Sequence, residues 1–459
     1  MTPDDIQCGA RTVAHLASYF AERKAAAREM LATMHAGERG YFTPSEDEDV
    51  RRLLVSYTQA RNALLELVLA LRTEESLAPE LRPAAFLVGY AAALLLVDGA
   101  RFLRETVHHR PLVRRKLNEA EPHFGIAAGT YETVQKSLTS PRHAWHLYHA
   151  RRFFAQYEQD LQRAADLDPL LRPCLASIHE HQERLEIPAA RYARARLRVR
   201  VGRTVRRIRD DLLVQAIYGV QKLASCLVSD ISTRPGHRPA LPVGVAAQLR
   251  DLARPGDVFV TRKEHAATNY FLPGFWPHAA LYLGDATALA ELGIETHEHV
   301  APRWSRLLAP PGAEPRRVLE ALKDGVWIRS IGSPLASDAI ALLRPRLDRD
   351  AIATALARGL FHEGKPYDFD FDFSRSDRLV CTEVVYRSYE GVGDVRFALT
   401  RRAGRWTLSA EDLLQMALER RHFEPVAVYA PHRAADAQTG AAADEALRAT
   451  CAATARVDF

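Results

Sequence analysis

The pattern of apolar and polar positions differs between the two halves of the chain. From residue 1 to about 228, apolar side chains recur every three or four positions, the spacing that places them on one face of an α-helix. The stripe of Val13, Leu16 and Phe20 is one example. Glycine and strand-like alternation are scarce in this half, so we predict an all-α domain over residues 1–228.

One segment of this half is unusually apolar. Residues 84–97 form the longest uncharged apolar run, fourteen residues in length. A helix that crosses a membrane needs about 20 such residues. The run therefore predicts a helix buried in the core of the first domain, with membrane association as the less favoured alternative.

The pattern changes near Ser229. Residues 229–245 keep no helical period and contain three prolines and two glycines, which predicts a linker. Beyond it, short segments bounded by glycine, proline or charge predict strands at 256–262, 278–284, 317–322, 325–331 and 425–430. Helices are predicted at 337–342, 349–360, 381–389 and 410–419. This mixture indicates an α+β domain over 246–431, and we expect 432–459 to be a disordered tail, with a short helix as the alternative.

Composition and charge narrow the classes of function. A chain of 459 residues is expected to form two or three domains, and 47% apolar with 26% charged residues is typical of globular proteins. The formal net charge is only +5, so the chain as a whole has no strong attraction for nucleic acids or acidic membranes. Binding of that kind would need a local basic cluster.

The cysteines and the first residues suggest a location. Five cysteines are widely spaced and include no C-x-x-C pair, which fits neither a disulfide scaffold nor a cysteine zinc site and suits a reducing compartment. The first residues are acidic and lack the basic and apolar regions of a secretory signal. We expect a cytoplasmic protein, and the alanine- and arginine-rich composition suggests a bacterial source.

One local basic cluster does occur. Nine arginines lie between Arg191 and Arg209, around an apolar helical stripe. The candidate contacts to an anionic partner are Arg194, Arg198, Arg203 and Arg206. The favoured alternative is a solvated helix face that pairs with acidic neighbours, because Tyr192 is the only aromatic side chain available for base stacking. Partner binding at this cluster stays open.

Several chemistries lack their usual motifs. There is no P-loop, no dinucleotide-binding G-x-G-x-x-G after a strand, no H-E-x-x-H and no G-x-S-x-G. His143, His146 and His149 recur every three residues, but two such steps turn about 120° around a helix, so the three do not share one face. His297 and His299 flank Glu298, but no further ligand set is evident. We therefore predict neither a metal nor a cofactor.

Cys381 is the first candidate for catalysis. It lies in L-V-C-T-E-V-V, after a polar loop and at the start of an amphipathic helix. Free backbone N–H groups and the helix dipole at that end favour a thiolate over a thiol. Such a sulfur is a nucleophile if an imidazole lies beside it, although a lone cysteine is more often a small buried apolar residue.

A histidine and a glutamate are candidate partners for this cysteine. His278 opens a predicted strand after Trp-Pro, a position at a sheet edge from which its ring can reach a helix N-terminus. Glu320 interrupts the apolar pattern of the strand at 317–322. A carboxylate there can accept the second ring N–H of the histidine, as in a catalytic triad. For each residue the alternative is an ordinary surface position.

Five blocks in this order resemble the permuted papain-like amidases, the YiiX/YebB-like branch of the NlpC superfamily. The blocks are R-P-G-D-V-F-V at 254–260, P-H-A-A-L-Y-L-G at 277–284, V-L-E-A at 318–321, G-K-P-Y-D-F-D-F at 364–371 and L-V-C-T-E-V-V at 379–385. The resemblance covers about residues 250–430. It implies a circularly permuted papain-like fold with the histidine before the cysteine. It departs from the family at Thr382, where serine is expected, and in the long stretch 284–317, a candidate lid or specificity loop.

The resemblance implies a Cys381 nucleophile, a His278 base and a Glu320 that orients the histidine. A peptide-like or N-acyl amide would be cleaved through a thioester on Cys381, with the oxyanion held by the Cys381 N–H and one further donor. Tyr367 is the candidate for that donor or for a substrate contact, whereas Asp257 is interpreted as a turn residue. Two alternatives stay open: an acyltransferase or lipid hydrolase that uses the same thiolate, with residues 84–97 shaping an acyl pocket, and a non-catalytic binding module that uses the arginine-rich helix.

Overall fold

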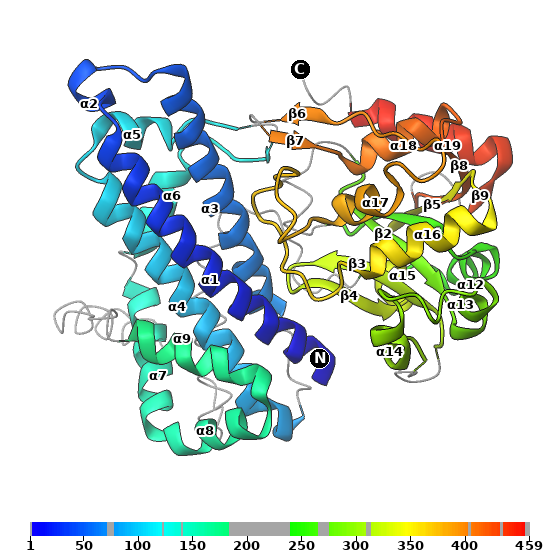
Figure 1. Ribbon diagram of the computed structural model, residues 1–459. Helices are drawn as coiled ribbons and strands as arrows, with labels where there is room; N and C mark the ends of the chain where they lie inside the picture. The colour runs from blue at the N-terminus through cyan, green and yellow to red at the C-terminus, as the bar shows by residue number, and fades with distance from the viewer. Residues whose placement is uncertain are drawn as a thin grey trace. The chain divides into compact units, whose positions relative to one another are not determined.

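A computed structural model describes residues 2–70, 78–121, 124–138, 141–182, 239–264, 275–308, 314–402, 405–431 and 435–454 (Figure 1). The chain divides into two units, one of residues 1–122 and 126–232 and the other of residues 123–125 and 233–459. The arginine cluster, including Arg194, Arg198, Arg203 and Arg206, lies outside the described residues, as does most of the predicted linker.

Apart from one isolated bridge between Glu121 and Ile126, the regular secondary structure described in the first unit is helical, which confirms the predicted class. Its helices are α1 (Pro3–Thr33), α2 (Ala36–Arg39), α3 (Pro44–Ala70), α4 (Arg82–Val107), α5 (Pro111–Lys116), α6 (Thr130–Leu138), α7 (Pro141–Gln156), α8 (Glu158–Leu167) and α9 (Arg172–Gln182), with short 3-10 turns at Pro79–Leu81 and Pro169–Leu171. The start of α1 follows from local chemistry: Thr2 and Asp5 form a capping box, and Pro3 occupies the first turn.

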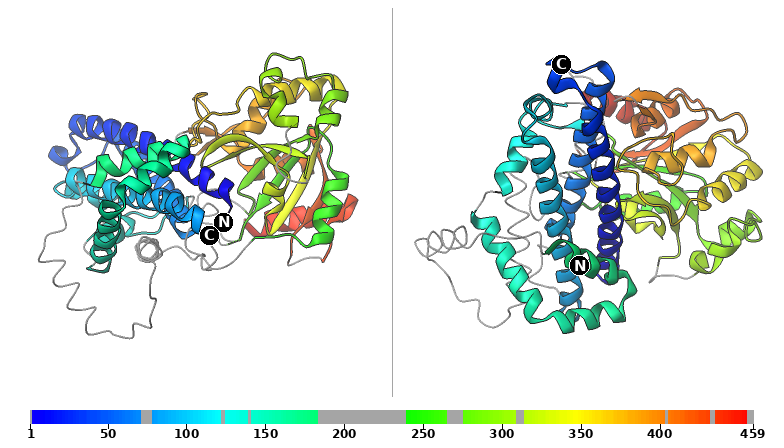
Figure 2. Two further views of the ribbon diagram at one scale, coloured as in Figure 1. Left: turned by 90° about the horizontal axis from the view of Figure 1, so that it is seen from below. Right: turned by 60° about the vertical axis from the view of Figure 1, so that its left-hand side comes forward.

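Helix α4 is the core of this unit. It packs against α1, α3 and α9, and the three long helices α1, α3 and α4 lie side by side in both views of Figure 2. Among the described helices, α4 is the one long and apolar enough to cross a membrane by length and composition, but 94% of that apolar window is buried inside the protein. Its buried Asp98 is ion-paired with Lys24 of α1, as a charge in a core must be. The apolar run 84–97 is thus a core helix, as predicted.

The second unit is built on an antiparallel sheet. Seven strands pair in the order β4-β3-β2-β1-β5-β8-β9, and β6 and β7 form a separate hairpin. The strands are β1 (Val258–Arg262), β2 (His278–Gly284), β3 (Arg317–Leu322), β4 (Gly325–Ser330), β5 (Ala339–Pro345), β6 (Thr400–Arg402), β7 (Arg405–Thr407), β8 (Phe423–Tyr429) and β9 (Gln438–Thr439). This α+β architecture confirms the predicted fold class.

Helices cover both faces of the sheet. Alternate residues of β1 enter different cores: Val258 and Val260 face one, and Phe259 the other. The first core is completed by α16 (Arg349–Leu360), α17 (Cys381–Tyr389), α18 (Ala410–Leu418) and α19 (Gly440–Thr454), and the second by α12 (Val243–Leu252) and α15 (Gly332–Leu335). The remaining short helices are α13 (Ala286–Glu291), α14 (Trp304–Leu308) and a 3-10 turn at Ala301–Arg303.

Three local predictions for this unit were wrong. Residues 337–342 were expected to be helical, but β5 begins at Ala339; a strand buried on both faces has a continuous apolar run, which periodicity does not distinguish from a helix. The expected linker ends early, because α12 begins at Val243. In place of the expected disordered tail, the structure has β9 and, as in the alternative expectation, a helix: α19 is ordered by burying Ala443 and Leu447 in the core.

Candidate active site

Cys381 is the first residue of α17, and its side chain is buried. The preceding residue, Val380, is extended, so the chain enters the helix abruptly at the sulfur. Helix α17 packs on β2 and β3, which brings the cysteine to the start of β2. The sulfur lies 4.0 Å from the carbonyl oxygen of Pro277, and the backbone N–H groups of Ala279 and Thr382 face it. Cys381 thus begins a helix, as predicted, and this helix start lies against β2, the strand that begins with His278.

His278 is the first residue of β2, and its side chain keeps 18% of its surface exposed. Its Nε2 lies 2.7 Å from Oε1 of Glu320. The ring also lies close enough to the Cys381 sulfur for each group to shift the pKa of the other. Because Nε2 faces the carboxylate, Nδ1 is the ring nitrogen left for the sulfur. The structure therefore brings together the three residues singled out from the sequence.

Glu320 lies in the middle of β3, and only 1% of its side chain is exposed. The hydroxyl of Ser333 donates to its Oε2 over 2.5 Å, and Nε of Arg329 lies 3.6 Å from the same oxygen. Burial alone would raise the pKa of this carboxyl, but the hydrogen bond and charge of His278, with Arg329 and Lys263 nearby, lower it to about 2. Glu320 is thus a fixed negative charge at neutral pH. Ser333 and Arg329 were missed, since nothing in their local sequence marks them.

The charges of the cysteine and the histidine support each other. Burial would lower the pKa of His278, but a Cys381 thiolate and the hydrogen bonds to Cys381 and Glu320 raise it to about 9. Burial alone would raise the pKa of Cys381. The charge and hydrogen bond of His278, with the two backbone N–H groups, instead bring this pKa below that of an ordinary thiol. The arrangement favours a thiolate–imidazolium pair around neutral pH.

Tyr367 lies near this pair. It forms an isolated parallel bridge with Leu379, two residues before the cysteine. Burial and the charge of Cys381 raise the pKa of Tyr367 well above that of a free tyrosine. Its hydroxyl consequently stays protonated and is able to donate a hydrogen bond. The structure thus places this predicted residue next to the segment that leads into Cys381, within range of the charge on the sulfur.

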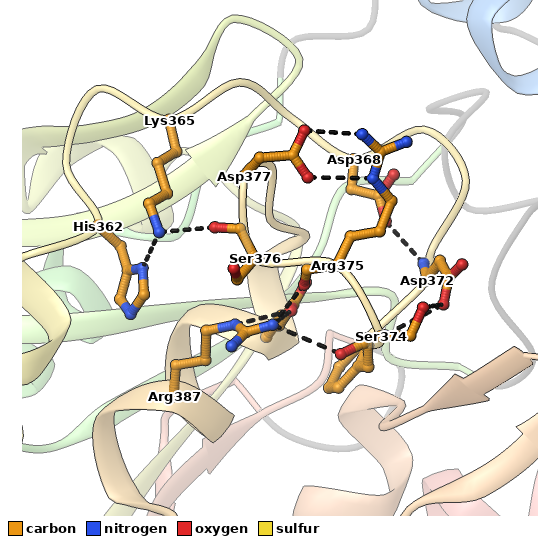
Figure 3. Close-up of polar contacts among 11 residues, drawn as sticks. His362, Lys365, Asp368, Asp372, Ser374, Arg375, Ser376, Asp377 and Arg387 are labelled. Atoms are coloured by element: carbon orange, nitrogen blue, oxygen red, sulfur yellow. Dashed lines mark hydrogen bonds and ion pairs between the residues drawn. The ribbon is translucent and has the colours of Figure 1, made fainter.

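The loop between α16 and α17 is held by its own polar contacts (Figure 3). Nζ of Lys365 contacts Nδ1 of His362 over 2.9 Å and donates to the carbonyl oxygen of Ser376 over 2.6 Å. In the middle of the loop, the Asp368 carboxylate accepts the backbone N–H groups of Asp370 and Asp372. These contacts give the polar segment before the cysteine a defined path.

Two buried acids beside the site were missed by the sequence reasoning. Burial, together with the charge of Asp370, raises the pKa of Asp368 to about 7. Burial raises the pKa of Glu383 to about 8, although its ion pair with Arg387 of the same helix opposes the shift. Both residues lie in blocks that carried the family resemblance, P-Y-D and C-T-E, and these blocks were the only available signal.

The remaining candidates lie apart from this chemistry. Asp257 accepts the backbone N–H of Arg254 over 2.8 Å and is ion-paired with Arg344, which fits its interpretation as a turn residue. Within the described residues, no group of three or more histidine, cysteine or acidic side chains could hold a metal ion. Of the paired histidines, His299 packs its ring against Phe361 at 4.7 Å.

The described parts of the long stretch 284–317 are anchored to the rest of the unit. Besides the His299–Phe361 contact, Arg303 and Arg306 are ion-paired with Glu363, whose side chain is 2% exposed. Helices α13 and α14 belong to this stretch, and Leu289 and Leu307 are buried in the core. These contacts pack the described parts of this stretch against the rest of the unit.

Comparison with known proteins gives one match. Residues 252–434 match a family described as permuted papain-like amidase enzyme, YaeF/YiiX, C92 family. No curated protein and no solved structure matches the chain. The match begins before β1 and ends after β8, so it contains the cysteine, the histidine and the glutamate described above.

Proposed function

We propose that Cys381, His278 and Glu320 are a catalytic triad, because residues 252–434 match the permuted papain-like amidase family, which implies a cysteine amidase or peptidase. The observation that carries the proposal is that the buried Glu320 is hydrogen-bonded to the His278 ring, and that this ring lies near the Cys381 sulfur at the start of α17. In a triad each group has a defined role that this geometry supports.

The proposed reaction is acyl transfer from an amide to water. The Cys381 thiolate attacks the amide carbonyl, and the imidazolium of His278 gives its proton to the leaving amine, which leaves a thioester on the sulfur. His278, now neutral, takes a proton from water, whose oxygen attacks the thioester and releases the acid. Glu320 stabilises the imidazolium in each half of the cycle. The Cys381 N–H and the Tyr367 hydroxyl are the proposed donors to the oxyanion.

The proposed substrate is a peptide-like or N-acyl amide, and the proposed location is the cytoplasm. The described cysteines Cys8, Cys174, Cys381 and Cys451 form no disulfide, which suits a reducing compartment. The acyltransferase alternative loses its structural support, because residues 84–97 are the buried core of a helical bundle. The binding-module alternative depends on the arginine cluster, outside the described residues.

Cysteine alkylation tests the proposed pair without knowledge of the substrate. In intact-mass analysis at pH 7 with limiting iodoacetamide, we expect the first adduct on Cys381, although Cys8 and Cys451 are more exposed. The reason is ionisation: burial and the charge of Glu411 raise the pKa of Cys451 to about 11, whereas the charge and hydrogen-bonding groups around Cys381 lower the pKa of its thiol.

His278→Ala should slow the Cys381 adduct by about tenfold or more, since the paired charge is lost. His422→Ala serves as the matched control, because His422 lies outside the proposed triad, and it should leave the labelling unchanged. Equal labelling of all accessible cysteines, or a Cys381 rate indifferent to His278→Ala, would show that there is no such pair.

A further inference from the structure

The short segment that leads into His278 is held from two directions. The backbone N–H of Phe275 donates to Oε1 of Glu411 in α18 over 2.7 Å. The Phe275 carbonyl accepts from Nη1 of Arg262, at the end of β1, also over 2.7 Å. The guanidinium of Arg262 lies over the Phe275 ring, 4.5 Å from its centre. Residue 275 is thereby tied to both β1 and α18.

The next residue, Trp276, is tied to the last helix of the chain. Its side chain is completely buried, and its indole N–H donates to Oγ1 of Thr450 in α19 over 3.1 Å. The Thr450 hydroxyl gives its own proton to the carbonyl of Leu447 over 2.8 Å. The oxygen is therefore oriented with a lone pair toward the indole. A buried tryptophan N–H needs such a partner, because leaving it unpaired costs about 1–3 kcal/mol.

Helix α19 lies outside the matched family region, which ends at residue 434. It packs on β8, β9 and α18, with Ala443 and Leu447 in the core (Figure 1). It thus lies beyond the matched region and reaches the segment before the histidine.

The anchored segment bears directly on the proposed pair. Pro277 follows Trp276, and its carbonyl oxygen lies 4.0 Å from the Cys381 sulfur. His278 comes next and begins β2. Any displacement of Trp276 therefore moves both the backbone beside the sulfur and the imidazole that holds its charge. A shift of a few tenths of an ångström alters a hydrogen bond of this kind measurably.

We propose that α19 is a positioning element of the active site, in which Thr450 acts through the buried Trp276 to hold His278 against Cys381. The inference rests on the proposed function. Thr450 touches neither the sulfur nor the imidazole, so it is a positioning residue.

The pH dependence of Cys381 alkylation in the full chain tests this role. Thr450→Val keeps the shape of the side chain and removes the acceptor oxygen. In this variant we expect the rate of Cys381 alkylation at pH 6 to fall about fivefold, the effect of losing one hydrogen bond. The pH at which alkylation reaches half its maximal rate, the alkylation midpoint, should rise toward that of an ordinary thiol. Trp276→Phe, which removes the indole donor, should move the midpoint in the same direction.

Thr450→Ser restores the hydroxyl and should restore the wild-type midpoint. Thr439→Val, at an exposed position in β9, is the matched control and should change nothing. A purely structural role would lower the thermal unfolding midpoint and leave the pH profile of the folded protein unchanged.

Three results distinguish the two proposals. Both proposals are supported if the wild type has a low alkylation midpoint and both His278→Ala and Thr450→Val raise it. A midpoint raised by His278→Ala but unchanged in both Thr450→Val and Trp276→Phe overturns the role of α19 alone. An ordinary thiol profile in the wild type, indifferent to His278→Ala, overturns the proposed function and the positioning role together.

Discussion

At the scale of single residues, the charge of Glu320 decides what His278 is able to do. A buried carboxylate that accepts from Nε2 fixes the tautomer of the ring and stabilises its protonated form. Ser333 and Arg329 hold the second carboxylate oxygen, so the charge also has a fixed direction. A neutral group of the same shape would keep the contact with His278 but would no longer stabilise the protonated ring.

Glu320→Gln tests this charge. We expect kcat/KM on an amide substrate to fall by about 10²–10⁴-fold, because the amide no longer stabilises the imidazolium and permits the wrong tautomer. The pKa of His278 should fall, measurable by NMR titration of the ring. Glu314→Gln, on a glutamate that pairs with Arg250, is the control with the same chemical change. Wild-type activity in Glu320→Gln would remove the glutamate from the mechanism.

The same pKa shifts predict a bell-shaped dependence of activity on pH. Activity should rise as Cys381 ionises, at a pH below that of an ordinary thiol. It should fall near pH 9, where His278 loses the proton that it gives to the leaving amine. Measuring kcat/KM between pH 4 and 10 checks both the rise at low pH and the fall at high pH. A single rise centred at the pKa of a free cysteine would contradict the paired state.

At the scale of elements, the pairing of β1 with β5 is stabilised by a buried ion pair. Asp257 is 1% exposed, and both of its oxygens accept from Arg344, over 2.9 and 2.7 Å. The same guanidinium donates to the carbonyl of Leu252, where α12 ends. One carboxylate thus links two central strands and a helix, although burial raises its pKa to about 6.

Asp257→Ala should destabilise the second unit by about 3–5 kcal/mol, because it leaves Arg344 without its partner in a largely buried place. Urea unfolding followed by circular dichroism would measure the loss. Asp251→Ala, at an exposed position of α12, is the control and should cost less than about 0.5 kcal/mol. If Asp257→Ala lowered the free energy of unfolding as little as the control does, the strand pairing would not depend on this contact.

At the scale of the whole molecule, each unit has its own hydrophobic core. Leu94 of α4 is buried in the helical unit, and Leu342 of β5 is buried in the sheet unit. Units with separate cores unfold as separate cooperative transitions when neither depends on the other.

Calorimetry should therefore show two thermal transitions. Leu94→Ala is expected to lower one of them and Leu342→Ala the other, each by the equivalent of about 2–5 kcal/mol. Preferential alkylation of Cys381 should disappear with the transition that Leu342→Ala lowers. A single transition that both substitutions lower equally would show that the two cores unfold together.

Local chemistry was enough to predict much of this protein from its sequence. Helical periodicity identified the helical half, because a helix that buries one face repeats every 3.6 residues whatever it packs against. Cys381 at a helix start, His278 at a strand start and Glu320 in an apolar strand were each visible as breaks in a local pattern, and their order along the chain carried the family resemblance.

Other features depend on contacts between residues far apart in the chain, and only the tertiary structure determines them. Residues 339–342 belong to strand β5 because they pair between β1 and β8, not because of their own spacing. Ser333 matters because α15 brings it to Glu320, and Thr450 because α19 folds back onto Trp276. Hydrogen-bond partners are selected by distance in the folded chain, which no local pattern of residues records.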